Sequence, residues 1–162
     1  MVIGAPGSGK STFAVAIGHR LGLPVIHPDR IFWQSGWVER SRADCRAMAL
    51  AAEDEPAWVI DGNFSPTWPG RMARAELVVW LDLPLPLRLW RILRRWARWR
   101  GRSRPDMPAN CPERLDPVFG WHVLTTARPS RKISAASMQG LPAGKAQRLG
   151  SRAAIAGWLA AV

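Results

Sequence analysis

Short runs of apolar residues recur along this chain, and within each run the apolar residues do not alternate with polar ones. Runs of this kind are typical of strands that are covered on both faces, as in a parallel sheet. They predict four strands and a weaker fifth, at residues 1–3, 25–27, 58–60, 77–81 and 146–149. Because helical segments separate the runs, the pattern predicts a doubly wound α/β fold.

The segments between the runs have the three- and four-residue spacing of helices. Apolar residues recur at this spacing from Phe13 to Leu21, and Gly22 followed by Pro24 ends the segment. A capping pattern begins at Ser41, and a long helical stretch follows two prolines further on. The predicted helices therefore cover about 13–21, 41–54, 84–100, 115–138 with a break at Pro129, and 151–162.

The first strand runs into the segment GAPGSGKST, which matches the phosphate-binding pattern G-x-x-x-x-G-K-[ST]. Glycines let backbone N–H groups converge on phosphate oxygens, and the positive end of the following helix adds to the attraction. In this pattern the lysine binds the β- and γ-phosphates, and the last hydroxyl ligates Mg²⁺. The sequence predicts a nucleotide-binding loop formed by Gly4, Pro6, Gly7, Ser8, Gly9, Lys10, Ser11 and Thr12.

Aspartates follow three of the predicted strands, at the ends where open α/β sheets bind their ligands. Asp61 follows the run that ends at Ile60, and we expect it to hold Mg²⁺. Asp29 precedes an aromatic loop, and we expect it to orient or deprotonate an acceptor. For Asp82 the sequence favours a turn-forming role, and for His27 a packing or capping role.

The helix predicted at 84–100 carries two parallel stripes. The apolar stripe, which we expect to face the core, consists of Leu85, Leu89, Ile92, Trp96 and Trp99. The basic stripe, one position along, consists of Arg88, Arg91, Arg95, Arg98 and Arg102. No acidic residue lies between Asp82 and Asp106, so these arginines repel one another unless an anion binds them. The alternative is a nucleic-acid groove in which the tryptophans stack on bases.

The loop after this helix is rich in Gly, Pro and Arg, and we expect a lid region over about 100–130. Closure of this lid would exclude water from a bound nucleotide. It would also bring Arg104, Arg128 and Arg131 to the γ-phosphate, since arginine can fork onto two phosphate oxygens.

A second region, at about 28–56, is predicted to bind the acceptor. Its aromatic residues Phe32, Trp33 and Trp37 offer a flat apolar surface for a ring. Local packing of these three side chains is an equal alternative.

Composition limits the kinds of partner. The chain has 162 residues, enough for one domain, and 23 Lys and Arg against 12 Asp and Glu, so its net charge is +11. This predicts anionic partners such as phosphates or nucleic acid, although an arginine-rich overall composition explains the surface arginines equally well. No stretch can cross a bilayer, so we expect a cytoplasmic protein without a membrane partner. We expect Cys45 and Cys111 to be free thiols.

These segments together resemble adenylate-kinase-like P-loop proteins, and most closely the DNA topology modulation proteins. The resemblance covers nearly the whole chain and depends on GAPGSGKST, HPDRIFWQSGW, WVIDGNF, VVWLDLP, RILRRWARWRGRSRPDM and CPERLD. It implies a three-layer P-loop fold with a core of five parallel strands and a small lid. It also implies ATP and Mg²⁺ as cofactors and phosphoryl transfer to a small acceptor.

By similarity to these kinases, Arg91 would stack near the adenine, Arg95 would reach the phosphates and Asp61 would hold Mg²⁺ through water. The chain departs from adenylate kinases at DGNFSPTWPGR, which lacks an arginine close behind the Asp-Gly. This argues against AMP as the acceptor, although Asn63 and Arg71 stay candidates for acceptor contacts. The first strand is one or two residues short, so we expect the natural start to lie upstream.

The leading hypothesis is ATP- and Mg²⁺-dependent phosphoryl transfer to a nucleotide or another small molecule, by a single domain at 1–162. A nucleic-acid-associated P-loop ATPase and an ATP-binding regulator without turnover stay open as alternatives. The acceptor and the oligomeric state are not specified by the sequence. In the kinase hypothesis the catalytic side chains are Lys10, Asp29, Arg95, Arg104, Arg128 and Arg131.

Overall fold

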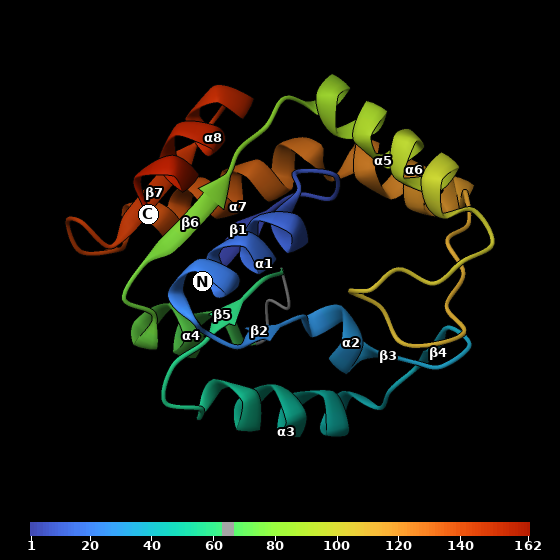
Figure 1. The fold of residues 1–162 in the computed structure, drawn as a ribbon, viewed down its shortest axis with the longest axis horizontal. Helices are drawn as coiled ribbons and strands as arrows, with labels where there is room; N and C mark the ends of the chain where they lie inside the picture. The colour runs from blue at the N-terminus through green and yellow to red at the C-terminus, as the bar shows by residue number, and fades with distance from the viewer. Residues whose placement is uncertain (63–66) are drawn as a thin grey trace.

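A computed structural model describes residues 1–62 and 67–162 as a mixed α/β structure in which helices flank parallel strands (Figure 1). Strands β1 (Val2–Gly4), β6 (Val78–Leu81) and β7 (Ala146–Leu149) form a parallel sheet in the order β1-β6-β7. Strands β2 (Val25–Ile26) and β5 (Val59–Ile60) form a separate parallel pair. The mixed α/β class with parallel strands is therefore confirmed.

The prediction of one five-stranded parallel sheet is wrong. Between β5 and β1 the described chain makes a single parallel bridge, from Asp61 to Val2, and the Gly62 N–H donates to the Val2 carbonyl at 3.1 Å. Gly62, the last described residue before the gap, has a φ of 119°, which glycine adopts readily. The strands thus form a three-stranded and a two-stranded sheet that meet at one point.

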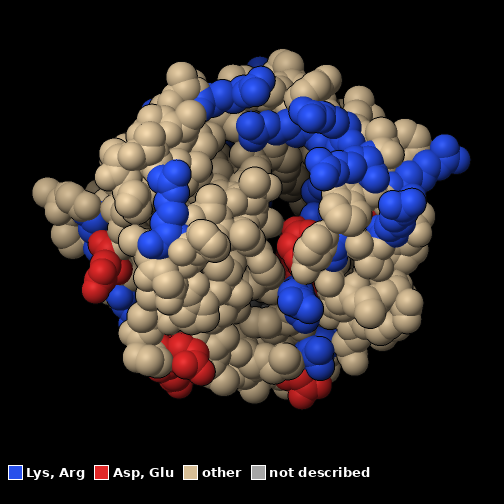
Figure 2. All heavy atoms as spheres, viewed as in Figure 1, with Lys and Arg blue, Asp and Glu red and all other residues tan. Residues whose placement is uncertain are grey.

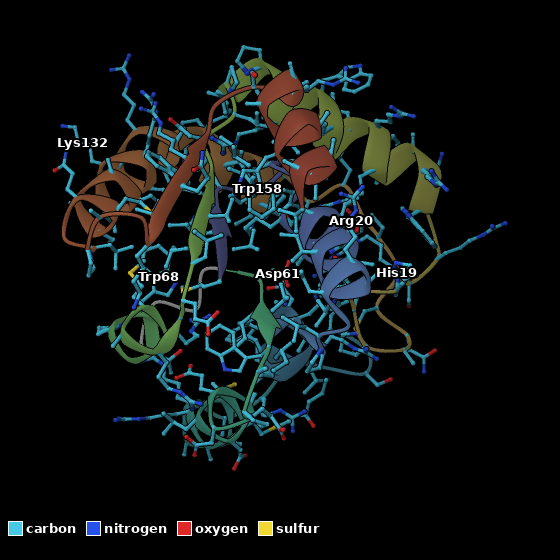
Figure 3. All side chains as sticks on the ribbon, turned by 60° about the vertical axis from the view of Figure 1, so that its left-hand side comes forward. His19, Arg20, Asp61, Trp68, Lys132 and Trp158 are labelled. Atoms are coloured by element: carbon cyan, nitrogen blue, oxygen red, sulfur yellow. The ribbon has the colours of Figure 1, made fainter. Side chains whose placement is uncertain are left out.

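Helices pack on both sides of the three-stranded sheet. On one side lie α1 (Lys10–Leu21) and α8 (Arg152–Ala161), whose Phe13 and Trp158 rings are 5.4 Å apart. On the other side lie α4 (Trp68–Arg74) and α7 (Ala127–Gln139), which bury Trp68 and Met138. Figure 3 shows Trp158 and Trp68 on opposite sides of the strands. Two apolar layers therefore enclose β1 and β6. This agrees with their sequences, in which apolar residues do not alternate with polar ones.

The remaining elements surround the ends of the strands. They are α2 (Pro28–Phe32), the antiparallel hairpin β3 (Trp33–Gln34) and β4 (Val38–Glu39), α3 (Arg42–Glu53), α5 (Leu85–Trp99) and α6 (Pro117–Thr125). The helix break predicted at Pro129 lies instead at Thr126, because Pro129 falls in the first turn of α7, where a missing N–H costs no helical bond. Both cysteines are free and buried, as expected.

No helix in the described part of the chain is long and apolar enough to cross a membrane.

Candidate active site

The segment from Gly4 to Thr12 runs from the end of β1, through the loop at residues 5–9, into the first turn of α1. Gly7 and Gly9 have φ values of 79° and 90°, which side-chain-bearing residues rarely adopt. A Cβ on Gly7 would lie 2.5 Å from the carbonyl oxygen of Arg88 in α5. The loop therefore needs glycine both for its backbone turns and for its close approach to α5.

The N-terminus of α1 has no capping side chain. Gly9 is the N-cap and forms no side-chain hydrogen bond, and the first turn contains no acidic residue. The first N–H groups of a helix have no partner within the helix, and the helix dipole adds positive potential there. The loop and this helix end thus provide donors that suit a phosphate group.

Lys10, the first residue of α1, turns its side chain back over the loop. Its Nζ lies 3.5 Å from the Ala5 carbonyl oxygen. Desolvation lowers the pKa of Lys10, while the nearby carboxylates of Asp29 and Asp61 act against this shift. The three side chains that the sequence placed at separate strand ends are therefore close enough to interact electrostatically.

Asp61 is almost fully buried, with 4% of its side chain exposed, and His27 Nδ1 lies 2.5 Å from its Oδ1. Burial lowers the pKa of His27, but the hydrogen bond and the charge of Asp61 outweigh it, so the pKa is raised overall. His27 therefore orients the Asp61 carboxylate. From the sequence alone, only a packing or capping role was favoured for His27. Figure 3 labels Asp61 where β5 ends beside α1.

Asp29 lies in the first turn of α2, and the residue is exposed. Surrounding protein atoms nevertheless withdraw enough water to raise the pKa of its carboxyl group, against the attraction of Lys10. Figure 2 shows a hollow in the face of the molecule seen in Figure 1, with Lys and Arg side chains along part of its rim.

Arginines of α5 hold the phosphate-binding loop. Arg88 Nε donates to the Pro6 carbonyl at 2.9 Å, and Arg91 Nη1 donates to the Ser8 carbonyl at 2.8 Å. Arg88 is buried, so the basic stripe lies partly beneath the loop rather than on a solvated surface. Sequence reasoning did not select Arg88 as a site residue, and its spacing on the stripe was the available signal.

Two other arginines predicted at the phosphates, Arg95 and Arg104, form ion pairs with carboxylates of the 101–114 loop. Arg95 and Arg104 both pair with Glu113, at 2.8 and 2.7 Å, and Arg104 also pairs with Asp106 at 2.7 Å. Part of the anionic charge that the arginine stripe requires therefore comes from the protein itself. Glu113 was not predicted, because nothing local in the sequence indicates its partners.

The aromatic residues of the predicted acceptor region contact one another edge to face. The ring centroids of Phe32 and Trp33 are 4.9 Å apart, and those of Trp33 and Trp37 are 5.2 Å apart. Trp37 Nε1 also donates to the Pro112 carbonyl at 3.1 Å. The aromatic cluster thus has local packing partners and reaches across to the 101–114 loop.

Further contacts join the β3–β4 hairpin to this loop. The Gly36 N–H donates to the Asn110 carbonyl at 3.1 Å, and Cys111 Sγ donates to the Gln34 carbonyl at 3.3 Å. The guanidinium of Arg114 stacks over the Trp37 ring at 5.4 Å. These interactions join the hairpin to the 101–114 loop, and we call them together the hairpin–loop contact.

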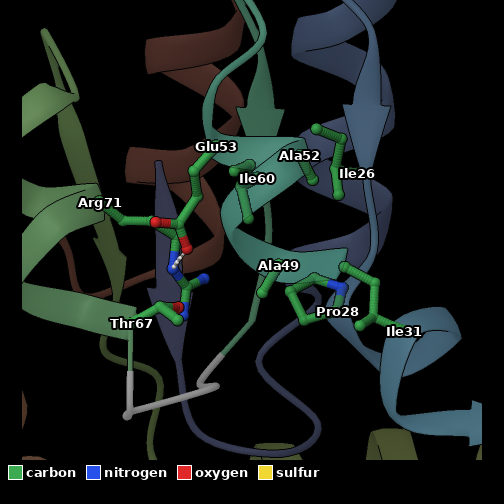
Figure 4. A pocket seen from close by; sticks show the side chains of 9 residues that line it. All are labelled: Ile26, Pro28, Ile31, Ala49, Ala52, Glu53, Ile60, Thr67 and Arg71. Carbon is green, nitrogen blue, oxygen red and sulfur yellow. Dashed lines mark ion pairs between the residues drawn. The ribbon is translucent and has the colours of Figure 1, made fainter. Parts of the chain in front are cut away.

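Arg71 lies on α4. It is 1% exposed and pairs with Glu53 of α3 at 3.2 Å, at the edge of a cavity of about 10 Å³ that has room for one water molecule (Figure 4). Asn63, the other residue predicted to contact the acceptor, lies outside the described residues.

Arg128 and Arg131 both lie on α7. Arg131 pairs with Asp82 at 2.9 Å, and Asp82 also binds Arg148 of β7 at 2.6 Å. Arg128 is exposed, and no contact joins it to the loop within the described part of the chain. The structure therefore does not bring these two arginines together with Lys10, Asp29 and Asp61.

The residues present fit a nucleotide with Mg²⁺. Three glycines with positive φ and an uncapped helix end can receive phosphate oxygens. Ser11, in the first turn of α1, and Asp61 are oxygen ligands, and Mg²⁺ usually takes only one or two of these from a protein beside waters and phosphates.

No protein-family model matches this chain, and no curated protein matches it.

Proposed function

We propose that this protein is a P-loop kinase that transfers a phosphoryl group from ATP to a small-molecule acceptor in the presence of Mg²⁺. The observation that carries the proposal is the uncapped start of α1 behind a glycine loop, with Lys10 folded over it. Asp61 and Asp29 are close enough to interact with Lys10, and Asp61 is buried whereas Asp29 is exposed. The resemblance of the sequence to adenylate-kinase-like P-loop proteins supports the same conclusion.

The donor site uses the loop and its neighbours. The loop amides and Lys10 bind the β- and γ-phosphates, with Lys10 supplying the positive charge. Ser11 and Asp61 hold Mg²⁺, which neutralises charge on the phosphates when it is bound. His27 fixes the carboxylate of Asp61 for this purpose, since the two groups share a 2.5 Å hydrogen bond.

The acceptor enters from the side of α2 and the hairpin. Asp29 forms no ion pair among the described residues, and it is exposed to solvent. It accepts the proton of the attacking hydroxyl as the phosphoryl group leaves ATP. Phe32, Trp33 and Trp37 provide an apolar wall beside it.

Arg95 and Arg104 neutralise charge on the transferred group. In the ligand-free protein both guanidinium groups pair with carboxylates of the 101–114 loop, Arg95 with Glu113 and Arg104 with Glu113 and Asp106. A bound triphosphate competes with these carboxylates for the same donors. Charge neutralisation is therefore coupled to rearrangement of the 101–114 loop.

The test is a transfer assay with ATP, Mg²⁺ and a panel of nucleosides, nucleoside monophosphates and small hydroxyl compounds, with ADP and phosphorylated product measured together. We expect equal amounts of both products for at least one acceptor. Ser11→Ala should lower kcat at least about 100-fold, since it removes a metal ligand. Ser151→Ala, which removes only the cap of α8, is the matched control.

The outcomes separate the proposal from its alternatives. Full activity of the Ser11→Ala variant would remove the metal assignment. ADP formed without a phosphorylated product, and stimulated by DNA, would replace the kinase with a nucleic-acid-associated ATPase. Tight ATP binding without any turnover would indicate a regulator.

A further inference from the structure

A row of apolar side chains on α6 faces solvent. Val118 is 75% exposed, Trp121 is 70% exposed and Leu124 is 48% exposed, whereas Val123 on the opposite side of the helix is fully buried. An apolar helix face of this kind is unusual on a soluble protein unless something covers it. The nine residues of α6 thus have a buried side and an unpartnered apolar side.

Basic side chains extend this row into α7. Thr126, between the two helices, has a right-handed helical backbone, with its N–H bonded to the His122 carbonyl and its carbonyl accepting the Ser130 N–H, both at 2.9 Å. At the break between α6 and α7 the chain therefore follows a near-helical path, with the same hydrogen-bond spacing on both sides of Thr126. Along that path Val118, Trp121, Leu124, Arg128 and Lys132 are spaced three or four residues apart, and we call them the α6–α7 row.

The row has no acidic neighbours along the chain. From Pro117 to Val162 the sequence contains no Asp or Glu, while both Arg128 and Lys132 are exposed. Figure 3 labels Lys132 on the outer side of α7, at the edge of the molecule. Three apolar side chains beside two cations fit a partner that presents an apolar layer under negative charge.

Charge decides among the candidate partners. A second copy of this chain, docked by two-fold symmetry, would place these cations against themselves or against the same uncompensated segment. Nucleic acid offers the negative charge, but it gives no favourable environment to Val118 and Leu124, because base readout and stacking use polar and aromatic groups. An anionic bilayer surface satisfies both halves of the row, since Trp and aliphatic side chains enter the interface while Arg and Lys meet lipid phosphates.

We propose that the α6–α7 row attaches this protein to the surface of a membrane that contains anionic lipid. The sequence predicted no membrane partner because no stretch could span a bilayer, but a helix that lies in the interface needs no spanning stretch. Arg128, which the sequence assigned to the γ-phosphate, then contacts lipid phosphate instead. This attachment is independent of the proposed kinase activity.

The test is sedimentation of the purified full chain with vesicles of phosphatidylcholine alone or mixed with one third phosphatidylglycerol. We expect binding to the mixed vesicles that weakens as salt is raised, and little binding to phosphatidylcholine. Trp121→Glu should lower the affinity for mixed vesicles at least about tenfold, and Arg128→Gln with Lys132→Gln about fivefold for each charge removed.

Leu50→Glu is the matched control, because Leu50 is 45% exposed on α3 and the change adds the same negative charge. It should bind vesicles like the unmodified chain. Unchanged thermal midpoints and unchanged circular dichroism spectra establish that every variant is folded.

Several results would overturn the proposal. One is the absence of vesicle binding by the unmodified chain, and another is equal vesicle binding by the Trp121→Glu variant. A third is oligonucleotide binding that Trp121→Glu abolishes while vesicles do not bind, which would make the row a nucleic-acid surface. A fourth is a dimer in sedimentation velocity that the same substitution dissociates.

Discussion

Lys10 carries its charge in a place where the protein solvates it poorly. Desolvation lowers its pKa, Arg88 and Arg95 push in the same direction, and Asp29 and Asp61 compensate only in part. A charge held in this way is unfavourable in the ligand-free fold and becomes favourable when an anion binds beside it. Lys10 therefore serves ligand binding at the expense of stability.

We predict that Lys10→Met abolishes ATP binding and at the same time raises Tm of the ligand-free protein by about 2–4 °C, for a gain of about 1 kcal/mol. The gain should be present at neutral pH. It should shrink as the pH rises toward 10.5, the ordinary lysine pKa, because the wild-type side chain then loses its charge in both states. Calorimetric titration with ATP and scanning calorimetry measure the two effects.

Lys132→Met is the control for this experiment, since Lys132 is exposed on α7. It should keep ATP binding and leave Tm within about 1 °C. A Lys10→Met variant that melts well below the unmodified protein would contradict the prediction, because it would show that Lys10 holds the loop in place.

His27 gives a second prediction at the scale of a residue. His27→Phe keeps a flat ring beside Asp61 but removes the only hydrogen bond that the Asp61 carboxylate forms within the described residues. The Mg²⁺ concentration for half-maximal turnover should rise at least about tenfold, while binding of metal-free ATP stays unchanged. His19→Phe, on the exposed side of α1, should change neither quantity. An equal loss of ATP and Mg²⁺ binding would instead indicate general damage to the site.

At the scale of elements, the hairpin–loop contact joins the β3–β4 hairpin to the 101–114 loop. It involves the two non-glycine residues of the described chain that have positive φ, Trp37 at 62° and Asn110 at 55°. Such backbone conformations cost energy and persist only where surrounding contacts enforce them. The contact is therefore a place where the structure can open at modest cost.

We predict that Trp37→Ala opens this contact and exposes Cys111, whose residue is 1% exposed and whose Sγ donates to the Gln34 carbonyl. Modification of Cys111 by a maleimide should become at least about tenfold faster, as measured by mass spectrometry of peptides. Cys45 is the internal reference, because it is equally buried on α3, and its rate should not change. Equal acceleration at both cysteines would mean global unfolding.

Elements with strong local signals were predictable from the sequence. Ser41 begins α3, and its hydroxyl accepts the Asp44 N–H at 3.1 Å, while Ser151 begins α8 in the same way with Ala154. The loop before α1 was predictable because its glycines and lysine occur in a fixed order. In each case the residues that determine the element are within a few positions of it.

The elements that were missed depend on distant parts of the chain. The β3–β4 hairpin has only two residues in each strand and is held by contacts such as Gly36 with Asn110, more than seventy positions away. The pairing of Arg95 and Arg104 with Glu113 likewise depends on the path of the 101–114 loop. The number of residues that pair between neighbouring strands also depends on tertiary packing rather than on the local sequence pattern. For this reason the division of the parallel strands into two sheets could not be predicted.

At the scale of the whole molecule, the net charge is +11, so a buried carboxylate that pairs with arginines reduces the repulsion between them. Asp82 is 7% exposed at the end of β6 and binds Arg131 of α7 and Arg148 of β7. Arg148 also stacks on the Trp80 ring at 5.0 Å. One carboxylate thus links the central strand to a helix and to the neighbouring strand, and it offsets repulsion between two arginines.

Burial alone would raise the pKa of Asp82, but the hydrogen bonds and charges of the two arginines outweigh it and lower the pKa below 3.8. A carboxyl group whose pKa is lower in the folded state stabilises the fold above its unfolded pKa. That stabilisation is lost as the pH falls through the folded value. We therefore predict that Asp82→Asn lowers the free energy of unfolding by about 2 kcal/mol at neutral pH, and that the difference disappears in acid below 3.8.

Urea denaturation over a series of pH values measures this difference directly. Glu76→Gln is the control, since it removes the same charge from an exposed residue just before β6 and should cost less than about 0.5 kcal/mol at every pH. A loss of stability in the Asp82→Asn variant that is the same at neutral and acid pH would mean that the side chain acts through packing. In that case the two arginines would have to be held by other contacts, and the charge of Asp82 would not be what joins β6 to α7 and β7.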